Sequence, residues 1–118
     1  MLELDQATFD GAIGGDPLLV DFWAPWCKPC RAIETVLESL AQDAAGRAEF
    51  AKLNIDEHPE IASRYEVFSI PTVMLFAGGE PQGTLVGARP RAHVERWLAK
   101  MLPAAELDGL AVQGQRDA

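Results

Sequence analysis

Residues 18–23 form an apolar run that a single aspartate, Asp21, interrupts, and a helical pattern begins shortly after it. A proline lies close to each end of the run, which is typical of a short buried strand. From Cys30 to about Ala45, apolar residues recur at intervals of three and four, which predicts a helix with one buried face. A buried strand followed at once by such a helix is typical of an α/β fold.

The rest of the chain continues this alternation. Further strands are predicted at residues 49–55, 71–76 and around 84–88, shorter helices at 5–13 and 59–65, and a last helix after Pro90. Gly78-Gly79 is typical of the turn of a hairpin. Strands joined by helices favour a parallel sheet, and the late hairpin adds an antiparallel edge. The sequence therefore predicts an α/β protein with three α/β/α layers, in which about four helices flank a mixed sheet of about four to five strands.

The length and the charge limit the classes of function. A chain of 118 residues is enough for one domain. We expect this domain at residues 1–103, followed by a weakly structured or docked tail at residues 104–118. A net charge of −8 disfavours nucleic acid, and no apolar run is long enough to cross a membrane. The first residues lack the pattern of a secretory signal, so we expect a cytoplasmic protein. We also expect it to be soluble and monomeric.

The chain has two cysteines, Cys27 and Cys30, three positions apart at the junction between the predicted strand and helix. A zinc site would need two more ligands, and apart from carboxylates the sequence offers only His58 and His93. A structural disulfide across so short a loop would add little stability. Working redox thiols are favoured over these two readings and over incidental buried cysteines, and we expect neither a metal nor a bound cofactor.

The expected position of the cysteines has chemical consequences. A helix N-terminus carries partial positive charge and unpaired N–H groups, which favour a thiolate over a thiol. Pro29 suits the first helical turn, where a missing N–H costs little. We therefore expect Cys27 to be an exposed, acidic nucleophile, and Cys30 to be the shielded thiol that resolves a mixed disulfide.

Asp21 is the one charged residue of the buried strand. A carboxylate buried without a partner has a raised pKa, which would suit it to move protons for the thiols. The alternative is that Asp21 faces water at the end of the strand. Lys52, on the next predicted strand, is a candidate partner for Asp21, although a strand lysine is more often simply solvated.

Three segments, taken in order along the chain, resemble the thioredoxin family. Residues 19–31, LVDFWAPWCKPCR, resemble its active-site strand and loop. Residues 51–56, AKLNID, resemble its central strand, and residues 69–72, SIPT, resemble the loop that holds the family's cis-proline. The resemblance covers residues 2–102 and implies the thioredoxin fold and a thiol-disulfide oxidoreductase with a redox-active Cys27–Cys30 disulfide.

The resemblance also implies roles for single residues. Cys27 would attack, Cys30 would resolve, and Asp21 would move protons for Cys30 with Lys52 near it. Pro71 would be cis and lie next to the disulfide. The substrate would dock on an apolar patch around the thiols, with strand-like hydrogen bonds to the backbone of Ile70. The expected patch consists of Trp26, Pro29, Ile70, Gly87 and Ala88.

Three positions depart from the usual pattern of the family. Lys28 stands where glycine is usual, and its charge next to Cys27 should stabilise the thiolate and make the protein slightly less reducing. Thr35 stands where a proline often bends the active-site helix, so we expect a weaker bend. Phe68 precedes the cis-proline loop and would either extend the docking patch or be buried.

The resemblance implies a protein-disulfide reductase that reduces oxidised protein substrates and is recharged by a flavin-containing, NADPH-dependent thioredoxin reductase. One alternative is an oxidase or isomerase of exported proteins, but such domains usually have histidine between the cysteines, and Lys28-Pro29 has none. Another alternative is a thioredoxin-like binding module or holdase, against which the intact Cys27, Cys30 and Asp21 argue. A specialised reductase with one dedicated substrate is a further alternative.

Overall fold

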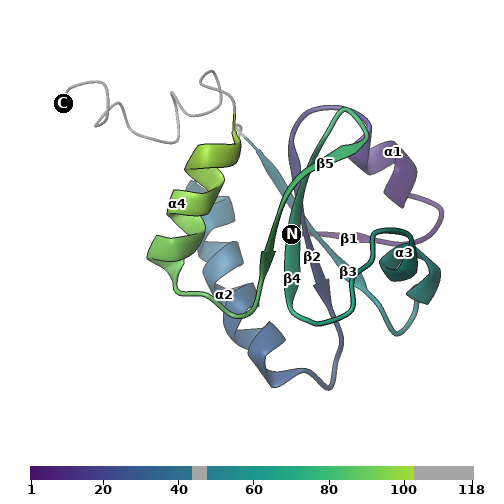
Figure 1. The fold of residues 1–118 in the computed structure, drawn as a ribbon, viewed down its shortest axis with the longest axis horizontal. Helices are drawn as coiled ribbons and strands as arrows, with labels where there is room; N and C mark the ends of the chain where they lie inside the picture. Colours follow the sequence, from purple (N-terminus) through teal and green to yellow (C-terminus); the bar gives the residue numbers. More distant parts are fainter. Residues whose placement is uncertain (44–47, 103–118) are drawn as a thin grey trace.

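The structure is a computed structural model that describes residues 1–43 and 48–102 (Figure 1). It contains a five-stranded sheet between two layers of helices, which confirms the predicted α/β/α architecture. The elements are β1 (Leu2–Leu4), α1 (Phe9–Ile13), β2 (Leu18–Trp23), α2 (Lys28–Asp43), β3 (Glu49–Asn54), α3 (Pro59–Arg64), β4 (Thr72–Ala77), β5 (Glu80–Val86) and α4 (Arg91–Met101). The tail predicted at 104–118 and the expected end of the long helix near Ala45 lie outside the described residues.

The sheet is mixed and has the strand order β1-β3-β2-β4-β5. The first three strands of this order are parallel, whereas β4 runs antiparallel to β2 and β5 runs antiparallel to β4. β1 is absent from our sequence prediction because three residues are too few to show a periodic pattern. It adds to the edge of β3 with Leu2 in register with Ala51.

β2 lies at the centre of the sheet, and its side chains alternate between two separate cores. Val20 and Phe22 pack in the core that α1 and α3 cover, while Leu19 packs in the core that α2 and α4 cover (Figure 1). Both faces of the strand are therefore buried, which explains its nearly continuous apolar run. By the same alternation, Asp21 points to the side of the sheet that α2 and α4 cover.

β5 begins at Glu80, earlier than the expected strand around residues 84–88, and ends at Val86. Gly78 and Gly79, both with positive φ, form a tight turn that brings Glu80 opposite Ala77. The pairing of β4 with β5 then shifts register after Leu75, at a bulge-like irregularity. β5 is an edge strand, and an edge strand tolerates a proline such as Pro81.

Local side-chain and proline signals determine where the shorter helices begin. Asp5 and Thr8 exchange hydrogen bonds between side chain and backbone, at 2.9 and 3.0 Å, so a turn precedes α1 and the helix itself starts at Phe9. Pro59 occupies the first turn of α3, and Pro90 immediately precedes α4.

Candidate redox site

The two cysteines lie where α2 begins. Cys27 directly precedes the helix and forms a disulfide with Cys30, with 5.3 Å between the two Cα atoms. The Cys30 N–H donates to Cys27 Sγ at 3.2 Å, so this sulfur accepts one of the free N–H groups of the first helical turn. Pro29, in the same turn, has no N–H to satisfy. The disulfide therefore lies within the partial positive charge of the helix N-terminus.

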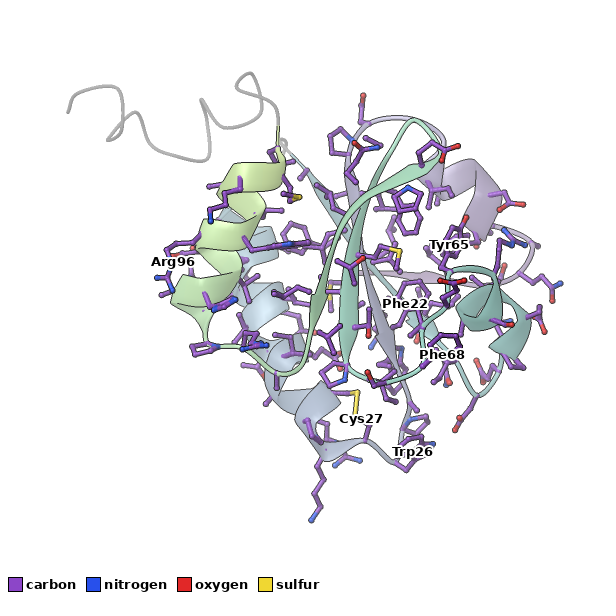
Figure 2. The ribbon with its side chains drawn as sticks, viewed as in Figure 1. Phe22, Trp26, Cys27, Tyr65, Phe68 and Arg96 are labelled. Carbon is purple, nitrogen blue, oxygen red and sulfur yellow. A yellow bond between two sulfur atoms is a disulfide. The ribbon has the colours of Figure 1, made fainter. Side chains whose placement is uncertain are left out.

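The expected exposure of Cys27 is wrong for this oxidised state. Cys27 is only 4% exposed, and Cys30, which we expected to be shielded, is 1% exposed. Cys27 is covered because its sulfur is bonded to Cys30 and turned toward the Cys30 N–H instead of toward solvent. Figure 2 shows Cys27 at the end of the molecule where α2 starts, with Trp26 beside it.

Asp21 is fully buried, which excludes the alternative that it faces water at a strand end. Among the described residues, neither carboxylate oxygen has a hydrogen-bond partner. Burial raises the pKa of Asp21 to about 7; the negative charge of Glu34 adds to this effect, and the positive charge of Lys52 opposes it. The site therefore contains a carboxyl group that can both hold and release a proton near neutral pH.

Lys52 lies next to Asp21 on the neighbouring strand, but the expected direct pairing between them is wrong. The Lys52 ammonium donates to Glu34 Oε2 at 2.9 Å and lies 4.9 Å from the centroid of the Trp23 ring. Partial burial lowers the pKa of Lys52, but the hydrogen bond and the charge of Glu34 outweigh that effect, and the pKa is raised. Lys52 thus acts on Asp21 only through its electric field.

Sequence reasoning missed Glu34. Its contact with Lys52 joins a helix to a strand, and no local pattern reports such a contact. The available signal was its spacing, because Glu34 follows Cys30 by four residues and so lies one helical turn further along the same face of α2.

The loop before β4 lies at the same end of the molecule as the start of α2 (Figure 1). The Ile70–Pro71 peptide bond is cis, as the resemblance implies. The Gly87 N–H donates to the Pro71 carbonyl at 2.9 Å, and Gly87 has a φ of 98°, a conformation that glycine adopts easily. The structure therefore brings Gly87 together with Pro71, while Ile70 is half-buried and Ala88 is exposed.

Trp26 is 67% exposed, and its ring is held in place because Nε1 donates to Asp56 Oδ2 at 3.0 Å. Phe68 is 87% exposed, so of its two expected alternatives the buried one is wrong (Figure 2). Two large aromatic surfaces are thus open to solvent, one beside the disulfide and one three residues before Pro71.

The two other departures from the family pattern lie on α2. Lys28, the first residue of the helix, is exposed. The Thr35 hydroxyl donates to the carbonyl oxygen of Arg31 at 3.3 Å, within a helix that runs without a break from Lys28 to Asp43. A hydroxyl bonded in this way is compatible with a continuous helix, because Thr35, unlike a proline, keeps its backbone N–H.

Residues 1–43 and 48–102 contain no group of three or more histidine, cysteine or acidic side chains that could hold a metal ion. Over the same ranges, no helix combines the length and the apolar character that crossing a bilayer requires.

Comparisons with known proteins agree with this geometry. A family model described as thioredoxin matches residues 1–100. A thioredoxin of Alicyclobacillus acidocaldarius is 48% identical over 102 residues, which cover 86% of this chain and 97% of that protein. A thioredoxin of Staphylococcus aureus is 43% identical over 102 residues, which cover 86% of this chain and 98% of that protein. Chloroplastic thioredoxin M4 of Arabidopsis thaliana is 48% identical over 86 residues, which cover 73% of this chain and 45% of that protein.

Proposed function

The chain belongs to the thioredoxin family and is a protein-disulfide reductase, and we propose that it serves as a general electron carrier of the cytoplasm that a flavin-containing, NADPH-dependent thioredoxin reductase recharges. The observation that carries the proposal is the Cys27–Cys30 disulfide at the start of α2, on the strand-to-helix junction that follows the buried Asp21. Relatives named thioredoxin match this chain over nearly their whole length, which supports the same use of the site.

In the proposed cycle, the reduced Cys27 thiolate attacks one sulfur of a substrate disulfide, and the other substrate sulfur leaves as a thiolate. Asp21 then takes the proton of the Cys30 thiol, and the Cys30 sulfur attacks Cys27 Sγ. The bond between Cys27 and the substrate breaks, and the second substrate sulfur also leaves as a thiolate. Two electrons have passed to the substrate, and the Cys27–Cys30 disulfide remains for the reductase to reduce.

The rest of the site suits the docking of an extended substrate chain. The exposed face of Trp26 offers apolar contact beside Cys27, and the loop of Ile70 and Pro71 offers backbone groups. Gly87 and Ala88 complete this surface, which Gly87 joins through its hydrogen bond to Pro71. We assign substrate docking to these residues and electron transfer to the two cysteines.

Reduction of insulin disulfides tests the proposal in two arms. With dithiothreitol as the electron source, the protein should accelerate the precipitation of the freed insulin chains. With NADPH and a bacterial thioredoxin reductase in place of dithiothreitol, NADPH oxidation should depend on the protein. Failure of the second arm alone would overturn the proposed recharging, and failure of both arms would overturn the function.

Two cysteine variants test the assigned order of attack. Cys30→Ser should accumulate a mixed disulfide between Cys27 and a substrate peptide, because the resolving thiol is missing. Cys27→Ser should accumulate none and should not reduce insulin. If Cys27→Ser trapped substrate as well as Cys30→Ser does, the assigned roles would be wrong. If Cys27→Ser kept the biological activity, the protein would instead act as a binding module.

A further inference from the structure

Asp21 and Lys52 share one row of the sheet, under α2. They are in register on the parallel strands β2 and β3, so their side chains leave the sheet on the same face. On the other side of Asp21, the residue in register on β4 is Val73, which is buried and apolar. Lys52 is therefore the one cation that this row brings next to the Asp21 carboxylate, within the part of the chain that the structure describes.

The Lys52 ammonium nevertheless bonds a different carboxylate, that of Glu34. The distance between the two groups is 2.9 Å, and both side chains are mostly buried, with 20% and 24% exposure. Contact with the Trp23 ring holds the ammonium in the same place. Asp21, by contrast, is left with two buried oxygens that no described group bonds.

Three carboxylates, from the two elements α2 and β1, act on Lys52, and among the described residues only one of them contacts its ammonium. Glu34 bonds its ammonium, whereas Glu38 on α2 and Glu3 on β1 act at a distance. The charges that reach Asp21 itself are those of Glu34 and Lys52. Removal of the Glu34 charge would therefore change the field at Asp21 in two ways, directly and through the position of the lysine.

On the basis of the proposed function, we propose that Glu34 is a positioning residue: it holds the Lys52 ammonium away from Asp21 and thereby keeps Asp21 basic enough to take the proton of Cys30. A free ammonium on the neighbouring strand would turn to the carboxylate and stabilise its charged form, which would weaken it as a base. Glu34 prevents this by neutralising the ammonium and by adding its own negative charge. The raised pKa of Asp21, to which Glu34 contributes, agrees in direction.

The location of Glu34 suits this role. It lies four residues after Cys30 on α2, so the helix that carries the resolving thiol also carries the residue that adjusts the base for that thiol. Glu34 takes no direct part in the proton transfer from Cys30 to Asp21 or in the exchange of sulfur bonds. The proton moves from Cys30 Sγ to an Asp21 oxygen, and the sulfur electron pair forms the bond to Cys27 as the substrate thiolate leaves.

The test uses Glu34→Gln, which removes the charge and keeps the size of the side chain, and measures two quantities. The first is the titration of the Asp21 carboxyl group, by carbon NMR of the oxidised protein. The second is the pH profile, from about pH 5 to 9, for release of a peptide from the mixed disulfide in rapid-mixing experiments. In Glu34→Gln, both midpoints should move down by about one pH unit or more. In Glu34→Asp, which keeps the charge, the midpoints should lie close to the wild-type values.

Glu38→Gln is the matched control, because it removes the same charge from the same helix without breaking a contact with Lys52. Its midpoints should stay within a few tenths of a pH unit of the wild-type values. A second comparison is made in the Lys52→Met background, where Glu34→Gln should shift the midpoints much less, because no ammonium remains to be released.

Three results would overturn the inference. The first is an unchanged profile in folded Glu34→Gln, and the second is an equal shift in Glu38→Gln. The third is a shift of the same size with and without Lys52, which would show that Glu34 acts directly and not by positioning the lysine. None of these results touches the proposed function, which the insulin assay of the wild-type protein tests separately.

Discussion

Replacement of Asp21 by asparagine should stabilise the oxidised protein, and the gain should grow with pH. In the folded chain burial raises the pKa of this carboxyl group to about 7, from 3.8 for an unperturbed aspartate. Between these two pH values the folded protein holds a proton that the unfolded chain has released. Stability therefore falls as the pH rises through this window, and asparagine, which does not titrate, removes that loss.

The size of the effect follows from the shift in pKa. A change from 3.8 to about 7 is about 3 units, and each unit corresponds to about 1.4 kcal/mol, so the wild-type protein loses about 4 kcal/mol between these pH values. The side chain is completely buried, so solvent screening does not reduce this figure. The free energy of unfolding of Asp21→Asn, relative to wild type, should therefore rise by about 4 kcal/mol between about pH 4 and pH 8.

Guanidinium unfolding of the oxidised proteins, followed by circular dichroism at several pH values, measures this difference. Asp16→Asn is the control, because it makes the same substitution at an exposed aspartate; only the pH-dependent change that exceeds this control is assigned to the buried Asp21. The reasoning would be refuted if the Asp21→Asn difference changed by less than about 1 kcal/mol over the range, since Asp21 would then titrate alike in the folded and unfolded chains.

Three further predictions concern the charge beside the nucleophile and the packing of α2 and α4. Lys28→Gly should lower the redox potential by about 10–20 mV, measured against glutathione, because the exposed ammonium no longer stabilises the Cys27 thiolate; an unchanged or higher potential would contradict this. Leu37→Ala should cost about 2–5 kcal/mol in denaturant unfolding, because Leu37 is completely buried, and a cost below about 1 kcal/mol would contradict its place in the core. Gly83→Ala should cost less than about 1 kcal/mol, because the new Cβ meets the Met101 sulfur, which lies near the end of a flexible side chain that can move aside; a cost above about 2 kcal/mol would show that Met101 cannot move.

Elements whose apolar pattern extends over several residues could be predicted from the sequence. The apolar run of β2 and the helical period of α2 each report burial that repeats along one element, so their existence and type were predictable. The three residues of β1 are too few for such a pattern. The start of β5 depends on the tight turn at Gly78 and Gly79, which sets the register of the hairpin.

At the site, contacts between residues that are close in the sequence could be predicted, whereas the contact between residues on different elements could not. The Cys27–Cys30 disulfide joins residues three positions apart, and the burial of Asp21 follows from the strand that contains it. The partner of Lys52 could not be predicted in this way. The order of the strands places Asp21 beside Lys52, while the packing of α2 on the sheet places Glu34 within reach of the same ammonium. Only the packed structure shows which of the two carboxylates the ammonium bonds.

The edges of the sheet bear on how such a protein meets other chains. A disulfide reductase works close to extended, partly unfolded polypeptides, which are the molecules most prone to add to an open sheet edge and begin aggregation. Here one edge, β1, is only three residues long, and the other edge strand, β5, carries Pro81, which has no N–H to donate. β1 is too short to pair with a long segment, and Pro81 removes one N–H group from β5 near the hairpin turn, so each edge has a feature that limits the addition of a substrate chain to the sheet.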